Sequence, residues 1–107
     1  MTYREQVLKN IANKVSVDDY IIMGALGLCG EAGEVVDLIK KHKFQGAALD
    51  RDKIIKELGD VRWYMEVLIH AMNTTMAEVE ERNVAKLNLR YPNGFSVKDC
   101  NEKKDEN

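Results

Sequence analysis

Residues 27–41 read GLCGEAGEVVDLIKK, and residues 56–68 read KELGDVRWYMEVL. In both stretches, apolar side chains recur at steps of three and four residues, which is the spacing of one face of an α-helix. Each stretch also carries two acids three residues apart, Glu31 and Glu34 in the first and Glu57 and Asp60 in the second. The two stretches therefore predict a pair of helices whose packing faces carry carboxylates.

The same periodicity predicts an all-α fold, a bundle of four helices. We expect these helices at about residues 2–14, 16–42, 51–72 and 75–91. Ser16 before Asp19, and Thr75 before Glu78, are patterns typical of helix starts. Pro92 ends the fourth helix, because the residue before a proline avoids helical geometry.

Length and composition indicate one small globular domain over residues 1–95, followed by a polar tail, 96–107, that we expect to be flexible. Hydrophobic residues make up 45% and charged residues 32% of the 107, which excludes a disordered or membrane-embedded class. The N-terminal stretch MTYREQVLKN has no apolar signal segment, so we expect a cytoplasmic protein. A net charge of −2 gives no general attraction to nucleic acid. We expect no membrane partner either.

The four acids are unusual because of their position on the predicted helices. Around the helix, the neighbours of Glu57 are Ile54, Val61, Tyr64 and Leu68, so this glutamate lies within the apolar face. A buried carboxylate must be paired with a cation or coordinate a metal. A buried network of salt bridges with nearby lysines is one reading. Four acids in one place favour a divalent cation instead, and oxygen ligands without histidine or cysteine suit Mg²⁺ or Mn²⁺.

Glycines recur at steps of three along the second predicted helix, at Gly24, Gly27, Gly30 and Gly33. Each glycine lowers helix stability by up to about 1 kcal/mol relative to alanine. The spacing indicates close approach of another helix or a ligand, and packing in an oligomer explains it equally well.

Basic side chains follow on the fourth predicted helix, where Asn83, Lys86 and Arg90 are spaced at three and four residues. Lys53 lies one turn before Glu57 and adds a cation near the acids. Metal ligands beside several cations describe a site for a polyphosphate. For Lys86 and Arg90, a solvated face or pairing with neighbouring acids is the alternative reading.

Three stretches, residues 27–41, 56–68 and 83–95 (NVAKLNLRYPNGF), resemble the MazG-like branch of the all-α nucleoside triphosphate pyrophosphatases. The family pattern is ExxE followed after a spacer by ExxD, and here 22 residues separate Glu34 from Glu57. The resemblance implies hydrolysis of a nucleoside triphosphate between its α- and β-phosphates. It also implies assembly as a homodimer or as a homotetramer built from two dimers.

Residue roles carried over from the resemblance form three groups. The Mg²⁺ ligands would be Glu31, Glu34, Glu57 and Asp60. The basic positions linked to catalysis or phosphate binding would be Lys53, Lys86 and Arg90, with Asn83 in the same motif. We add the hypothesis that Glu31 orients or deprotonates the attacking water.

Other functions stay open at this point. A carboxylate-bridged iron or manganese bundle usually carries Glu-x-x-His, whereas Glu66 and His70 are four residues apart. A non-catalytic helical interaction module is a second alternative. Within the pyrophosphatases, a dUTP/dCTP-selective enzyme or a phosphoribosyl-ATP pyrophosphatase is the nearest variant. The candidates for a base pocket, which are Tyr3, Gln6, Trp63 and Tyr64, do not reveal the base. We interpret Trp63 as a packing or interface residue.

Overall fold

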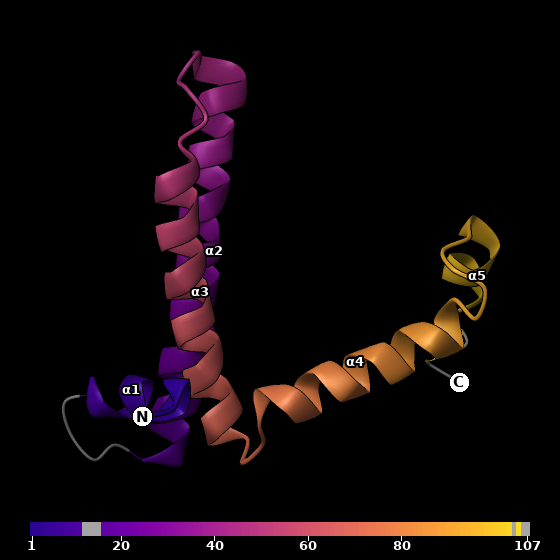
Figure 1. Cartoon of the computed structure of the whole chain (residues 1–107), viewed down its shortest axis with the longest axis horizontal. Coiled ribbons are helices and arrows are strands. Elements are labelled where there is room, and N and C mark those ends of the chain that lie inside the picture. Colours follow the sequence, from indigo (N-terminus) through magenta and orange to yellow (C-terminus); the bar gives the residue numbers. More distant parts are fainter. Residues whose placement is uncertain (12–15, 104, 106–107) are drawn as a thin grey trace. The chain divides into compact units, whose positions relative to one another are not determined.

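The computed structural model describes residues 1–11, 16–103 and 105, and over these residues the chain is helical without a strand. Its helices are α1 Tyr3–Lys9, α2 Val17–Gln45, α3 Arg51–Ala71, α4 Met76–Arg90 and α5 Val97–Glu102 (Figure 1). The all-α prediction is therefore confirmed. Within the described ranges, no helix has the length and apolar character needed to cross a membrane.

Each helix begins at a Ser, Thr or Asp whose side chain accepts a hydrogen bond from the backbone N–H three residues later. These caps are Thr2, Ser16, Asp50, Thr75 and Ser96. In α1 the side chain of Glu5 also accepts from the Thr2 N–H, which completes a capping box. The starts of the helices are thus determined by short segments of sequence.

The ends of the first two helices differ from the prediction. α1 ends at Lys9, and residues 12–14 of the predicted helix lie outside the described residues. α2 continues to Gln45, three residues beyond the predicted end. It stops there because Gly46 adopts the left-handed conformation, with φ 72°, and its N–H donates to the Lys41 carbonyl.

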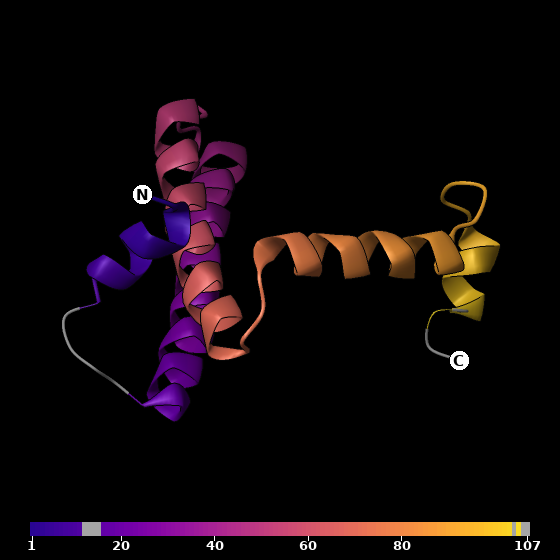
Figure 2. The ribbon, with the colours of Figure 1, turned by 60° about the horizontal axis from the view of Figure 1, so that its bottom comes forward.

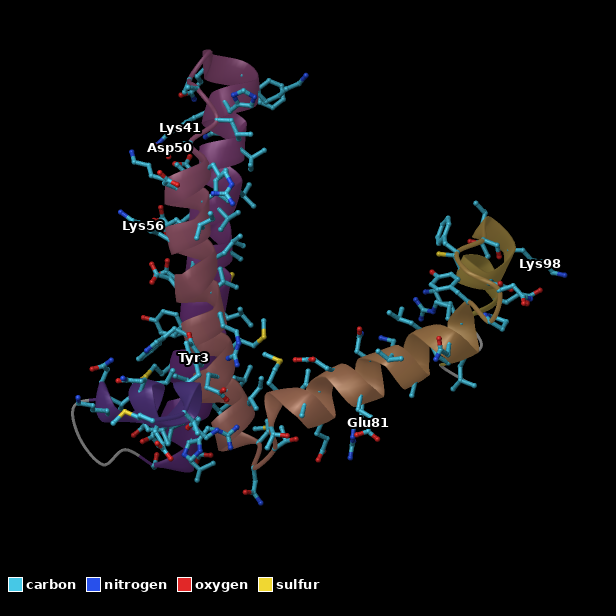
Figure 3. The ribbon with its side chains drawn as sticks, viewed as in Figure 1. Tyr3, Lys41, Asp50, Lys56, Glu81 and Lys98 are labelled. Atoms are coloured by element: carbon cyan, nitrogen blue, oxygen red, sulfur yellow. The ribbon has the colours of Figure 1, made fainter. Side chains whose placement is uncertain are left out.

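The chain divides into two compact units. The first unit, Met1–Asn73, contains α1, α2 and α3. α2 and α3 lie side by side as an antiparallel hairpin, joined by the loop at residues 46–50 (Figures 1 and 2). Figure 3 shows Lys41 and Asp50 at the loop end of this hairpin. The antiparallel arrangement brings the middle of α2 against the middle of α3, where the acids are found.

Glycines let the two long helices approach closely. A Cβ atom at Gly24 would lie 2.9 Å from the Cβ of Leu68, and one at Gly27 would lie 2.1 Å from the ring of Tyr64. At Gly30 and Gly33 such an atom would meet nothing within 4 Å in the described structure. Two of the four glycines therefore serve helix–helix packing within the chain.

Charged side chains join α1 to α3. Glu66 is 4% exposed and accepts from Arg4 at 3.0 Å and from Arg62 at 3.1 Å. The Arg62 guanidinium also lies 4.5 Å from the ring centre of Tyr3, which Figure 3 labels. Only Val7, Val67 and Ile69 are buried hydrophobic residues in the described part of the chain.

The second unit, Thr74–Asn107, contains α4 and α5. Within the tail that we expected over residues 96–107, the structure has α5, Val97–Glu102, and the flexibility of the tail stays a prediction. Ser96 caps this helix, and beyond its end Asp105 forms an ion pair with Arg90 of α4. Since α4 belongs to this unit, the four-helix bundle and the single domain over residues 1–95 stay predictions.

Candidate metal and substrate site

Three carboxylates meet where α2 crosses the middle of α3. Glu31 of α2 and Glu57 and Asp60 of α3 each place one oxygen within 4.8 Å of the other two. Glu57 and Asp60 share a face of α3 because residues three apart on a helix are neighbours. The hairpin then brings Glu31 opposite this pair, so the cluster requires both helices. We call these three residues the acid cluster.

The acid cluster lies at the edge of the α2–α3 contact. Glu31 and Glu57 are half-buried, whereas Asp60 is exposed. Glu34, the fourth predicted ligand, is exposed and is not part of the group of three. The expectation that all four acids face the core is therefore met only in part. The reason is that one neighbouring helix covers only one side of each acid-bearing helix.

Partial burial and neighbouring negative charge affect the acidity of Glu31. Partial removal from water is the largest cause that raises the pKa of Glu31 above its ordinary value, followed by repulsion from Asp60 and Glu57. A hydrogen bond with the Glu57 side chain and the charge of Glu34 act in the same direction. The acid cluster is thus short of positive charge.

Replacing Glu31 by glutamine tests this electrostatic arrangement. Because the folded chain holds the Glu31 proton more tightly than the unfolded chain does, Glu31 stabilises the fold at low pH. That stabilisation is lost as the pH rises through the raised pKa. Without divalent cations at pH 7, we expect Glu31→Gln to raise the midpoint of thermal unfolding above that of the wild type.

Asp18→Asn is the matched control for this experiment. It also removes one negative charge from α2, but 13 residues away, or about 20 Å along the helix. Because Asp18 lies in the first turn of α2, its replacement should lower the midpoint slightly. A midpoint for Glu31→Gln at or below that of the wild type in cation-free buffer would contradict the predicted repulsion.

A pocket of about 290 Å³ opens beside the acid cluster. Its lining consists of Glu31, Asp60, Trp63 and Tyr64. The volume lies at the small end of the range for ligand sites, about 300–1,000 Å³, so it fits one part of a nucleotide. Both aromatic residues were among the generic candidates for a base pocket in the sequence. They follow Asp60 on α3, Trp63 by three residues and Tyr64 by four.

The acid cluster fits a hard divalent cation. Its donors are carboxylate oxygens from two helices, without histidine or cysteine, which suits Mg²⁺ or Mn²⁺ rather than zinc or copper. The mutual repulsion at Glu31 is relieved when a cation lies between these oxygens. Glu31, Glu57 and Asp60 would be the direct ligands, with Glu34 nearby.

The predicted basic residues lie in different places. Lys53 is exposed in the first turn of α3, one turn before Glu57. Asn83, Lys86 and Arg90 belong to α4 in the second unit, where Asn83 and Lys86 are exposed. The structure therefore joins Lys53 and the acid cluster in one unit, while the role of the α4 residues stays a prediction.

Arg90 has a partner that sequence reasoning missed. Its guanidinium donates to both carboxylate oxygens of Asp105, one contact being 3.0 Å. The hydrogen bond from Arg90 holds the pKa of Asp105 below its usual range, and the charge of Lys86 contributes. An anionic group that binds Arg90 must therefore compete with Asp105 or join it.

Comparison with known proteins decides the family. The MazG nucleotide pyrophosphohydrolase domain matches residues 24–95, which include all eight site residues singled out from the sequence. The chain belongs to the MazG family. The matched range also contains the whole acid cluster and the pocket beside it.

A relative of this MazG chain is the Gene 37 protein of Mycobacterium phage L5. The two are 37% identical over 73 residues, an alignment that covers 64% of this chain and 64% of the phage protein. The chain thus spans less than two thirds of the length of that relative. No solved structure matches this MazG chain.

Proposed function

We propose that the chain hydrolyses nucleoside or deoxynucleoside triphosphates between the α- and β-phosphates, with Mg²⁺ as cofactor and Mn²⁺ as a possible substitute. The products are a nucleoside monophosphate and pyrophosphate. The observation that carries this proposal is the acid cluster, which two helices of a MazG domain bring together. The purpose of this reaction in the cell would be control of the nucleotide pool.

The protein residues have separate tasks in this reaction. Glu31 would orient the attacking water and accept its proton. Its half-buried position beside Glu57 and Asp60 supports this role. Lys53, one turn before Glu57, would offset negative charge on the phosphates. Asn83, Lys86 and Arg90 would bind further phosphate oxygens through α4.

A divalent cation bound at the acid cluster would neutralise negative charge on the phosphates. Glu31, Glu57 and Asp60 would hold it, and Glu34 would complete the set. One carboxylate oxygen of Glu31 cannot both bind the cation and accept the proton of the water. A carboxylate has two oxygens, and these can divide the two tasks.

Product analysis tests the proposed reaction. The purified chain is incubated with Mg²⁺ and each common ribo- and deoxyribonucleoside triphosphate, and the products are separated by chromatography. We expect equal amounts of monophosphate and pyrophosphate. Release of inorganic phosphate and a diphosphate would contradict cleavage between the α- and β-phosphates, and absence of turnover with both Mg²⁺ and Mn²⁺ would contradict the proposal as a whole.

We also propose that the chain works as a homodimer or as a dimer of dimers. Support comes from large apolar side chains that one chain leaves exposed along α2 and α3, among them Leu26 at 71% and Val36 at 64%. A groove of about 420 Å³ on α2, which includes Val36 and Phe44, belongs to this surface. Light scattering that gives the mass of one chain, 12.2 kDa, would contradict the proposal.

A further inference from the structure

We infer that Trp63 forms the nucleobase subsite of this enzyme, by stacking its indole on the base of the bound nucleotide. The inference rests on the proposed function, since it names where the base of the triphosphate lies. It also replaces our interpretation of Trp63 as a packing or interface residue. The observation that carries it is the pocket in which Trp63 shares a wall with two members of the acid cluster.

The order of side chains along α3 matches the order of groups in a nucleotide. Lys53 comes first, then Glu57 and Asp60, then Trp63. Three residues of α-helix span about 4.5 Å along the helix axis. Trp63 therefore follows Asp60 at a distance comparable with the width of a sugar ring. The triphosphate would extend toward Lys53 at the start of α3, and the base would extend the opposite way.

Neighbouring side chains hold the indole in place. Trp63 meets Tyr64 edge to face, with ring centres 4.9 Å apart and planes at 81°. Tyr64 is itself seated against Gly27 of α2, since a Cβ atom there would lie 2.1 Å from its ring. Trp63 is half-buried, so its position is determined while part of its surface remains available to a ligand.

The chemistry of the pocket favours a base over a phosphate at Trp63. The indole carries no charge and only one hydrogen-bond donor, so it offers little to a phosphate. Every base has a π-face, and stacking on an aromatic side chain depends only weakly on which base is present. Trp63 should therefore contribute affinity for nucleotides in general and little discrimination between bases.

Trp63 is the single tryptophan of the chain, so its fluorescence reports on this subsite alone. The probes are the non-hydrolysable α,β-imido analogues of the four common deoxynucleoside triphosphates, and inorganic tripolyphosphate, each with Mg²⁺. We expect each nucleotide analogue to change the emission of the wild type. Tripolyphosphate should bind, as calorimetry would show, with little change in emission.

The variant Trp63→Ala should bind the nucleotide analogues about 5- to 150-fold more weakly, while its affinity for tripolyphosphate stays within a factor of about two. Trp63→Phe keeps an aromatic face and should recover most of the lost affinity. Circular dichroism and light scattering of both variants check that fold and assembly are unchanged.

Several results would overturn the inference. Equal weakening of nucleotide and tripolyphosphate binding in Trp63→Ala would make Trp63 a structural residue. A changed mass of the assembly would make it an interface residue. Binding of tripolyphosphate but of no nucleotide analogue by the wild type would overturn the base subsite and leave phosphate binding intact. Binding of neither probe would overturn the proposed function itself.

Discussion

Glu57→Gln should reduce kcat/KM for nucleoside triphosphates by about 10³-fold or more. The glutamine keeps the shape of the side chain but removes one of the charges that hold a cation in the acid cluster. Metal-assisted charge stabilisation contributes several kcal/mol to such reactions, and about 4 kcal/mol corresponds to this factor. Steady-state release of pyrophosphate measures the change.

A second measurement separates loss of the cation from loss of the fold. Mg²⁺ at about 100 times its Kd should stabilise the wild type by about 2.7 kcal/mol, which raises the unfolding midpoint by about 10–20 °C. Glu57→Gln should lose most of this increase, whereas Asp18→Asn should keep it. A variant that retains both the Mg²⁺-dependent increase and activity would refute the role of Glu57 as a ligand.

Gly27→Ala should destabilise the first unit even though alanine is the better helix former. The new Cβ would lie 2.1 Å from Cδ1 and 2.4 Å from Cγ of Tyr64. Because Cγ is close to the backbone, a small rotation of the ring cannot relieve the clash, so α2 and α3 must separate. Such overpacking costs about 1–3 kcal/mol, which exceeds the gain in helix propensity of up to about 1 kcal/mol.

Gly30→Ala is the matched control, since it makes the same change on the same helix, at a position with nothing within 4 Å in the described structure. It should raise the free energy of unfolding by about 0.5–1 kcal/mol. Urea denaturation compares the two variants. If Gly27→Ala proved as stable as Gly30→Ala, this would contradict the close packing of the Tyr64 ring against Gly27.

Features encoded by neighbouring residues were predictable from the sequence. Thr75 and Glu78, or Ser16 and Asp19, identify a helix start because the cap joins residues three apart. The pairing of acids on one face of a helix follows from spacing alone. The close approach at Gly27 was also indicated, although its partner was not.

Features that depend on distant residues could not be predicted in this way. Glu66 takes its partner Arg4 from 62 residues away, and nothing local distinguishes it from any other glutamate of α3. The partner of Arg90, Asp105, lies 15 residues further along the chain, in a segment whose polarity suggested flexibility. The exposure of Asp60 likewise depends on which other elements cover α3, and helical periodicity does not predict those neighbours.

The helix caps have a consequence for how the chain folds. Each links a side chain to an N–H three residues on, so it needs no contact between helices. Denatured chains retain fluctuating local structure, including nascent helices. Helix growth takes nanoseconds per residue, far faster than closure of a long hairpin. The unfolded ensemble should therefore already contain nascent helices that start at Ser16 and Asp50, and the contact between α2 and α3 then stabilises them.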